Sequence, residues 1–147
     1  MDRILDRLWC GSYDDAQRVL EVPPASPITY ILNVSQYPYQ GATDLPTVHY
    51  PIQDEVFLPA ATWENLTHLL ADLLAARYTV LVHCRLGKSR APSLCAAYLM
   101  RCGYSAEKAL RLVKLVRDEA DPHPETWASV LAWFTGNPSE RFGMEGK

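Results

Sequence analysis

A continuous apolar segment between two helix-forming segments is the feature that most restricts the fold of this chain of 147 residues. Residues 78–82 read YTVLV, an aromatic and β-branched run that favours a strand. The residues before this run repeat with the period of a helix: Leu66, Leu69, Leu70, Leu73 and Leu74. The residues after it, 91–101, predict a second helix that ends at Gly103. A strand that is apolar on both faces is typical of a parallel sheet covered by helices, so the segment predicts an α/β fold.

Further strands and helices extend this pattern along the chain. Short β-branched or aromatic runs bounded by turn residues predict three more strands, at residues 8–10, 28–34 and 47–50. Helical periodicity and capping serines predict three more helices, at residues 12–20, 105–116 and 127–134. We therefore expect one α/β domain over residues 1–135, with a central, mostly parallel twisted sheet flanked by helices. Residues 136–147 are predicted to form a C-terminal tail.

Charge and patterning exclude several classes of protein. The formal net charge of −3 gives no global attraction to nucleic acid or to an anionic membrane surface. Residues 1–7 contain acids and lack the apolar core of a signal peptide. Asp72, Arg77 and His83 interrupt the longest apolar stretches well before the length of a membrane span. We expect a cytoplasmic monomer with no nucleic-acid partner and no membrane span.

The cysteines predict reduced thiols and not a disulfide framework or a metal site. The chain contains four of them, Cys10, Cys84, Cys95 and Cys102. No CxxC or His-x-x-x-His spacing occurs, so we expect no metal and no cofactor. Because a low-pKa thiolate oxidises readily, Cys10 or Cys95 is a candidate resolving partner for Cys84, although the sequence places neither within disulfide reach.

The predicted strand at residues 78–82 runs into a segment with a thiol and three cations, HCRLGKSR at residues 83–90. A cysteine that attacks phosphorus must be a thiolate, and a free thiol with a pKa of about 8.5 is mostly protonated at neutral pH. Three features would lower the pKa of Cys84: the positive end of the following helix, the inward-facing amides of a turn that Gly87 permits, and the charge of Arg90.

The same segment would also bind a phosphate. Its five residues between the cysteine and the arginine form a loop about as wide as one phosphate, whose amides can donate to the oxygens. The planar guanidinium of Arg90 can bind two phosphoryl oxygens side by side. Both contacts strengthen as charge builds on the equatorial oxygens during transfer. The predicted phosphate-binding residues are Arg85, Leu86, Gly87, Lys88, Ser89 and Arg90.

Residues 83–90 resemble the His-Cys-x-x-Gly-x-x-Arg signature of the cysteine-dependent protein tyrosine phosphatases, specifically of the small dual-specificity branch. Other stretches resemble the strands and helices of that branch: residues 4–12, 31–35, 97–100 and 109–127. The resemblance implies a metal-independent phosphomonoesterase that acts on phosphotyrosine, and on phosphoserine or phosphothreonine as well, through a phosphocysteine. It implies Cys84 as nucleophile, Arg90 as phosphate clamp and His83 as a support for the loop.

The family also uses a general acid on a mobile loop about thirty residues before the cysteine. Residues 51–54, PIQD, resemble that segment, which implies Asp54 as the acid. An alkoxide or phenoxide leaves poorly unless it is protonated, and the same carboxylate can then activate water against the phosphocysteine. Glu55 is adjacent and is the alternative, which separate substitutions of the two acids would distinguish.

Two features depart from what the family and a single phosphate require. Ala91 stands where the family usually has Ser or Thr, whose hydroxyl donates to the departing thiolate. We therefore expect the phosphocysteine to accumulate, unless Ser89 or Ser93 compensates. Arg85 and Lys88 add two cations beyond those needed for one phosphate, and they either lie in solvent or contact a second phosphate.

Several functions stay open at this stage. A phosphorylated protein or a small phosphoester is the expected substrate. Arg85 and Lys88 favour an inositol-phosphate or phosphoinositide phosphatase. Cys84, Arg90 and Asp54 together argue against a phospho-binding pseudophosphatase, although Ala91 leaves that function open. Sulfur transfer of the rhodanese type also uses a cysteine loop, but the fixed arginine and the upstream acid argue against it. Tyr37 and Tyr39 are candidates for the rim of a shallow cleft or for loop packing.

Overall fold

The computed structural model describes residues 1–21, 25–39 and 43–136, and its strands and helices follow the predicted order. The strands in this part are β1 (Asp2–Leu5), β2 (Leu8–Gly11), β3 (Tyr30–Asn33), β4 (Thr47–His49) and β5 (Val80–His83). The helices are α1 (Tyr13–Glu21), α2 (Ala60–Ala75), α3 (Arg90–Arg101), α4 (Ala106–Val116) and α5 (Pro124–Gly136). None of the helices in the described part is long and apolar enough to cross a membrane.

The strands form one sheet in the order β1-β2-β5-β3-β4. Strands β2, β5, β3 and β4 run parallel, and β1 pairs antiparallel with β2. The central strand β5 is buried along its whole length, which explains its continuous apolar sequence. At its end, His83 pairs with Gly11 on one side and with Asn33 on the other. The carboxyl ends of three parallel strands therefore meet at one edge, where ligands bind in open α/β sheets.

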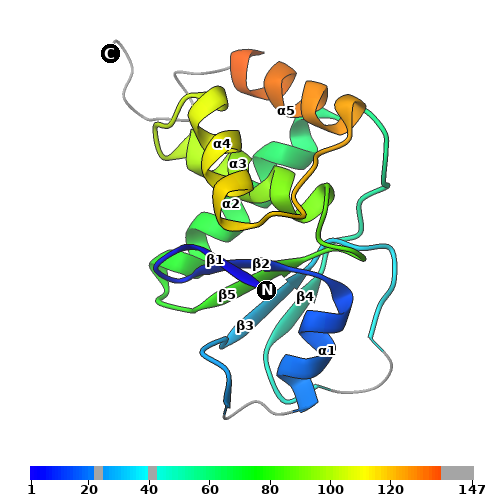
Figure 1. Ribbon diagram of the computed structural model, residues 1–147, viewed down its shortest axis with the longest axis vertical. Coiled ribbons are helices and arrows are strands. Elements are labelled where there is room, and N and C mark those ends of the chain that lie inside the picture. The colour runs from blue at the N-terminus through cyan, green and yellow to red at the C-terminus, as the bar shows by residue number, and fades with distance from the viewer. Residues whose placement is uncertain (22–24, 40–42, 137–147) are drawn as a thin grey trace.

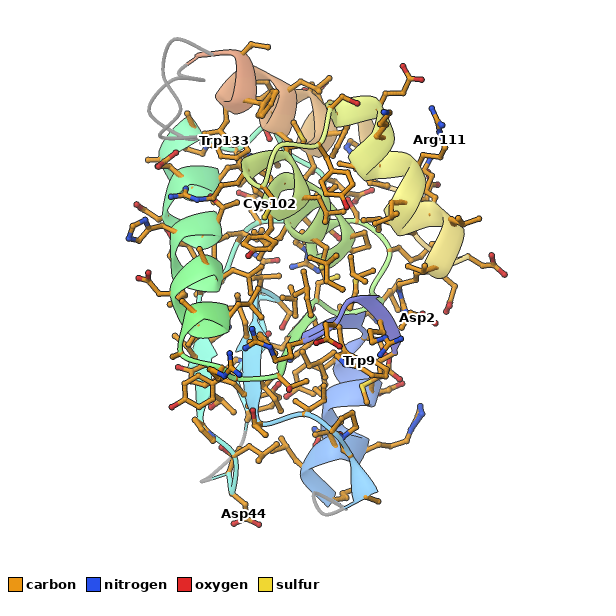
Figure 2. All side chains as sticks on the ribbon, turned by 90° about the vertical axis from the view of Figure 1, so that its left-hand side faces the viewer. Asp2, Trp9, Asp44, Cys102, Arg111 and Trp133 are labelled. Carbon is orange, nitrogen blue, oxygen red and sulfur yellow. The ribbon has the colours of Figure 1, made fainter. Side chains whose placement is uncertain are left out.

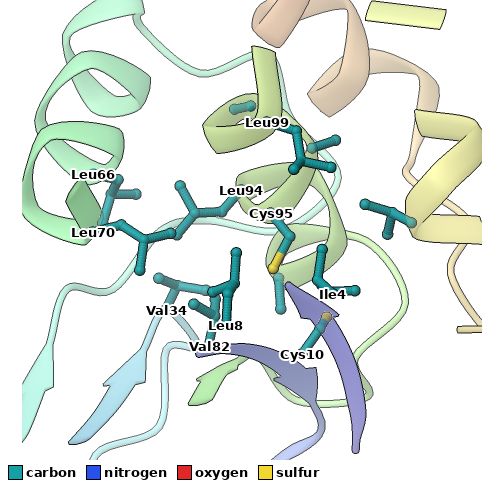
Figure 3. Packing of buried hydrophobic residues seen from close by; sticks show 14 of the residues in the cluster. Ile4, Leu8, Cys10, Val34, Leu66, Leu70, Val82, Leu94, Cys95 and Leu99 are labelled. Carbon is teal, nitrogen blue, oxygen red and sulfur yellow. The ribbon is translucent and has the colours of Figure 1, made fainter. Parts of the chain in front are cut away.

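Helices cover both faces of this sheet, with α2 to α5 on one side and α1 on the other (Figure 1). Each side has its own apolar cluster. Figure 3 shows the larger cluster, in which Leu66 of α2 and Leu94 of α3 lie above Val82 of β5. The smaller cluster packs Val19 of α1 against Leu81. Because successive strand residues point to opposite faces, neighbouring residues of β5 serve different clusters.

The structure differs from the predicted elements in two places. Strand β1 is not predicted, because Asp2 and Arg3 make its sequence half polar. It forms at the edge of the sheet because its pairing with β2 satisfies the backbone. Helix α5 begins at Pro124, earlier than predicted, since a proline is tolerated in the first turn of a helix, where its missing N–H has no partner. Apart from Gly136, which ends α5, the expected C-terminal tail lies outside the described residues.

Candidate active site

The predicted phosphate loop, residues 84–89, connects the end of β5 to the start of α3 at Arg90. It lies at the sheet edge described above, where the parallel strands end. Gly87 has a φ of +72°, which residues with a side chain rarely adopt. A Cβ at this position would also approach the carbonyl oxygen of Gly11 to 2.7 Å. The loop therefore needs glycine both for its backbone conformation and for its close approach to β2.

The thiol of Cys84 is buried, with only 2% of the residue exposed. Its Sγ accepts a hydrogen bond from the backbone N–H of Ala91 at 3.4 Å, in the first turn of α3. Burial raises the pKa of Cys84, whereas the amides of Ala91 and Gly87 and the charge of Arg90 act to lower it. The sequence predicts a net lowering, and that expectation is wrong for this structure. The predicted contacts are present, but the loss of water around the thiol outweighs them.

The guanidinium of Arg90 is buried against the segment that carries the predicted acid. Its Nη1 donates to the carbonyl oxygen of Ile52 at 3.2 Å. Its Nε lies 3.4 Å from Oδ1 of Asp54, an ion pair that lacks hydrogen-bond geometry. Within the described residues this buried Nε has no hydrogen-bond partner. A buried donor without a partner costs free energy, which an anion bound in the cleft would recover.

The two candidate acids have different surroundings. The Asp54 side chain is 43% exposed and its Oδ1 accepts the N–H of Glu55 at 3.0 Å, besides its contact with Arg90. The Glu55 side chain is 71% exposed and its Oε2 lies 4.0 Å from Nε2 of His123. Asp54 is therefore the acid that contacts the predicted phosphate clamp, and Glu55 faces a different part of the cleft.

Arg117, the residue after α4, holds one half of the phosphate loop. Only 2% of it is exposed. Its Nε donates to the carbonyl oxygen of Gly87 at 2.7 Å and its Nη2 donates to that of Leu86 at 3.4 Å. Its Nη1 donates to Oδ2 of Asp2 at 2.7 Å, and Figure 2 shows Asp2 beside the end of α4. The sequence does not predict these contacts of Arg117, called the brace, because Arg117 belongs to no recognisable motif and Asp2 is 115 positions away.

Residues 121–123 hold the other half of the loop. The N–H of Asp121 donates to the carbonyl oxygen of Lys88 at 2.6 Å. The N–H of His123 donates to Oγ of Ser89 at 2.8 Å. The sequence identifies this segment only as a proline-containing break between helices, and it carries no local signal of a role at the site.

His83, which is predicted to support the loop, is completely buried. Its Nδ1 donates to the carbonyl oxygen of Cys84 at 3.0 Å, and its Nε2 accepts from the hydroxyl of Tyr39. Burial lowers the pKa of His83 to about 4, so the ring is neutral at physiological pH. Of the two alternatives for Tyr39, the structure favours loop packing, because its hydroxyl is bound to this histidine.

These residues surround one cleft of about 450 Å³. The cleft is lined by Asp54, Glu55, Cys84, Arg85, Leu86, Lys88, Ser89, Arg90, Asp121, Pro122, His123 and Pro124. It thus brings together the predicted nucleophile, clamp and acid, although the last lies thirty positions from the first. Within the described ranges, no three His, Cys, Asp or Glu side chains form a group that could hold a metal ion.

Comparison with known protein families agrees with this arrangement. The profile of the family described as "Dual specificity phosphatase, catalytic domain" matches residues 8–135. The chain belongs to the dual specificity phosphatase family. It is therefore a protein phosphatase of the protein-tyrosine-phosphatase type, a class that works in general through a phosphocysteine intermediate. The family resemblance and the fold class predicted from the sequence are both confirmed.

Individual relatives cover most of the chain. Human dual specificity phosphatase 28 is 33% identical over 136 residues, which span 87% of this chain and 74% of that protein. Its crystal structure superposes with a TM-score of 0.81 and covers 95% of this chain and 99% of that one. The protein-tyrosine-phosphatase IBR5 of Arabidopsis thaliana is 30% identical over 132 residues, which span 88% of this chain and 49% of that protein.

Proposed function

We propose that this phosphatase hydrolyses phosphotyrosine, and phosphoserine or phosphothreonine as well, with Cys84 as nucleophile, Arg90 as phosphate clamp and Asp54 as general acid, without a metal ion. One observation carries the proposal. The Cys84 thiol, the unpartnered guanidinium N–H of Arg90 and the Asp54 carboxyl group belong to a single cleft. They supply the nucleophile, the anion donor and the proton donor that hydrolysis of a phosphomonoester requires.

The first step transfers the phosphoryl group to sulfur. After Cys84 has lost its proton to water, the thiolate attacks phosphorus, and the bond between phosphorus and the leaving oxygen breaks as the S–P bond forms. Asp54 gives its proton to the leaving oxygen. Arg90 and the amides of residues 85–89 bind the equatorial oxygens, where negative charge accumulates. The 3.4 Å contact between Arg90 and Asp54 supports the role of Asp54, because it puts this side chain beside the proposed phosphate clamp. The carboxyl group must be protonated for this step.

The second step releases phosphate, with Asp54 now accepting a proton and Cys84 now acting as the leaving group. A water molecule attacks the phosphocysteine, Asp54 takes its proton, and the S–P bond breaks to return the thiolate. The N–H groups of Ala91, 3.4 Å from Sγ, and of Gly87 are donors available to that thiolate. Ser89 lines the cleft and accepts a hydrogen bond from His123, which leaves its own proton free to donate. Ser93 does not line the cleft, so Ser89 is the better candidate to replace the hydroxyl absent at position 91.

Because position 91 lacks the usual hydroxyl, an experiment must decide whether the protein hydrolyses the phosphoester through both steps or only binds phosphate. We expect a rapid-quench experiment with 4-nitrophenyl phosphate to show a burst of 4-nitrophenol close to one per enzyme, because the second step is slower than the first. Ala91→Ser should reduce the burst and raise kcat several-fold. Turnover without a burst would contradict the slow second step, and phosphate binding without any product would indicate a pseudophosphatase.

A second candidate function is hydrolysis of inositol phosphates or phosphoinositides. The observation in its favour is that Arg85 and Lys88 are exposed at the cleft and form no ion pair within the described residues. Two free cations beside the clamp could bind a second phosphate of the same molecule. A panel of phosphotyrosine peptide, phosphothreonine peptide and inositol phosphates would rank the candidates by kcat/KM.

The central test is hydrolysis of 4-nitrophenyl phosphate by the wild-type protein and by Cys84→Ser, each with and without a chelator. The wild type should be active under both conditions, and Cys84→Ser should lose about 10⁴-fold or more, as expected for a lost nucleophile. Cys102→Ser is the matched control, since Cys102 is exposed and lies after the far end of α3. Activity that disappears with the chelator would contradict the metal-independent mechanism.

We also propose that residues 1–135 form the catalytic domain of a cytoplasmic monomer. All four cysteines are free thiols, which supports a reducing compartment. Sedimentation of the purified protein should give the mass of one chain, 16.6 kDa. A dimer that persists on dilution would contradict the monomer.

A further inference from the structure

A second hollow adjoins the catalytic cleft. It has a volume of about 640 Å³ and is lined by Tyr13, Asp14, Tyr37, Pro38, Arg85 and Leu86. We call this hollow the side groove. Arg85 and Leu86 line both the side groove and the catalytic cleft. The two sites are therefore adjacent, and a molecule bound in the cleft can extend over Arg85 and Leu86 into the side groove.

The backbone that forms the side groove is held in place by buried groups. Asn33 and Ser35 are completely buried, and both donate to the carbonyl oxygen of Tyr37, at 2.9 and 3.2 Å. The hydroxyl of Tyr13 donates to the carbonyl oxygen of Pro38 at 3.0 Å. The side groove therefore exists before any ligand binds, which reduces the entropic cost of binding.

The side groove is also fixed relative to the phosphate loop. The backbone N–H of Tyr13 donates to the carbonyl oxygen of Arg85 at 3.0 Å. The ring of Tyr13 lies edge-on to the buried His83, with 5.5 Å between the ring centroids. Because His83 in turn binds the carbonyl oxygen of Cys84, the side groove keeps its position relative to the nucleophile.

The exposed surface of the side groove is largely apolar. Tyr37 is 55% exposed and Leu86 is 57% exposed, although both are large and apolar. Asp14 and Arg85 carry opposite charges, and neither forms an ion pair within the described residues. An apolar surface with little net charge favours a neutral, apolar side chain over a charged one.

We propose that the side groove is a subsite for an aromatic or aliphatic side chain two positions from the phosphorylated residue of a protein substrate. The inference rests on the proposed function, in which the cleft holds the phosphorylated side chain. In an extended peptide, residues i and i+2 point to the same side and lie roughly 6.6 Å apart. The two sites share Arg85 and Leu86 in their linings, so neighbouring side chains on one face of an extended peptide can reach both. An aromatic side chain can pack on Tyr37 and Pro38 while the peptide backbone passes over Leu86.

A peptide fits the side groove better than a second copy of the chain. The six lining residues are far fewer than the roughly 20–30 residues that each partner contributes to a stable protein interface. The side groove also adjoins the cleft at Arg85 and Leu86, so its occupant is expected to be part of the molecule whose phosphate is removed.

The experiment compares phosphotyrosine peptides that differ only at the positions two residues before or after phosphotyrosine, with Phe, Ala, Asp or Lys there. For the wild type, we expect kcat/KM to be roughly threefold to tenfold higher with Phe than with Ala at one of the two positions, as for one aromatic contact. Tyr37→Ala should bring this ratio close to one, and Tyr37→Phe should keep it. The ratio is taken within each variant, so a general loss of activity cancels.

Tyr104→Ala is the matched control, because Tyr104 is also an exposed tyrosine but lies beyond the far end of α3. Its ratio should equal that of the wild type. A wild type that hydrolyses the peptides without a preference for Phe, or a Tyr37→Ala variant that keeps the preference, would overturn the subsite and leave the proposed function intact. A wild type that hydrolyses no phosphopeptide would overturn both. A Tyr37→Ala variant that changes sedimentation but not selectivity would assign the side groove to self-association instead.

Discussion

The two segments that meet at the catalytic cleft, the phosphate loop and the segment with Asp54, are fixed by different contacts. The phosphate loop is fixed by hydrogen bonds from Arg117, Asp121 and His123, which come from the end of α4 and the segment before α5. The segment with Asp54 is attached to the loop mainly through Arg90, which binds Ile52 O and faces the carboxylate. Its acid is nearly half exposed, whereas the thiol is buried.

This difference matches the tasks proposed for the two segments. The nucleophile and its anion donors must keep one geometry, because electrostatic stabilisation of a transition state depends on preorganised dipoles. The acid must serve a leaving oxygen in the first step and a water molecule in the second. A carboxyl group that is partly exposed and contacts only Arg90 and the N–H of Glu55 within the described residues can serve both positions.

Among the substitutions that test this comparison, loss of the proposed clamp should have the largest effect. We expect Arg90→Lys to lower kcat for a phosphotyrosine peptide by about 10²–10³-fold, because a point charge cannot replace a planar guanidinium that binds two oxygens. Arg101→Lys, at the other end of α3, is the control and should stay within about twofold of the wild type. Similar losses in the two variants would show that the helix is disturbed as a whole and would contradict a specific clamp.

The proposed general acid should come next. We expect Asp54→Asn to reduce kcat by on the order of 10²-fold with a phosphotyrosine peptide, within the range for a lost general acid. The loss should shrink with 4-nitrophenyl phosphate, whose leaving group needs less protonation. Glu55→Gln should change neither rate more than about twofold. If Glu55→Gln showed the larger, leaving-group-dependent loss, Glu55 would be the acid.

Substituting Arg117 tests whether its hydrogen bonds fix the phosphate loop. Arg117→Gln should lower the free energy of unfolding by about 2–3 kcal/mol, because it leaves Asp2 and two loop carbonyls without their charged donor. Arg111→Gln removes an exposed ion pair with Glu107 and should cost about 0.5 kcal/mol or less. Urea unfolding measures both. We also expect Arg117→Gln to lower kcat more than it raises KM, and unchanged kinetics would contradict the brace.

The buried histidine should give the smallest effect, visible as a dependence of stability on pH. Its pKa falls from 6.5 to about 4 on folding, so the unfolded chain binds the proton more tightly. His83 therefore stabilises the fold fully above pH 6.5, and this contribution is lost as the pH falls toward 4. Between pH 7 and pH 5 the loss is about 2 kcal/mol.

The control removes the titrating group. His83→Gln should lack this part of the pH dependence, so the difference in unfolding free energy between it and the wild type should narrow as the pH falls. The half-exposed His123, placed beside Glu55, is the comparison. A larger change of slope in His123→Gln than in His83→Gln would show that another histidine controls the acid response.

Much of the fold and the centre of the site could be predicted from the sequence, because they depend on local patterns. The leucine period of α2, the apolar run of β5 and the HCRLGKSR loop each lie within a short stretch of chain. The identity of the acid needed the family resemblance in addition. The contact between Asp54 and Arg90 supports it, since it joins residues that no local pattern connects.

Other features could not be predicted because they arise from contacts between distant segments. Strand β1 exists through its pairing with β2, and its own four residues do not favour it. Arg117 reaches a loop 30 positions earlier and an aspartate 115 positions earlier. The same holds for the pKa of Cys84: the sequence correctly supplied the amides and the arginine, but it could not reveal how completely the thiol is buried.

The sequence by itself therefore determined the proposed nucleophile, the proposed clamp and the glycine between them, because seven consecutive residues carry all three. Only the tertiary structure decided which distant residues hold the loop, which contacts each acid makes, and that a largely apolar side groove adjoins the cleft at Arg85 and Leu86. The physical reason is the range of the interactions. Turn geometry and helix period act over a few residues, whereas burial and buried hydrogen bonds depend on segments that meet only after the chain has folded.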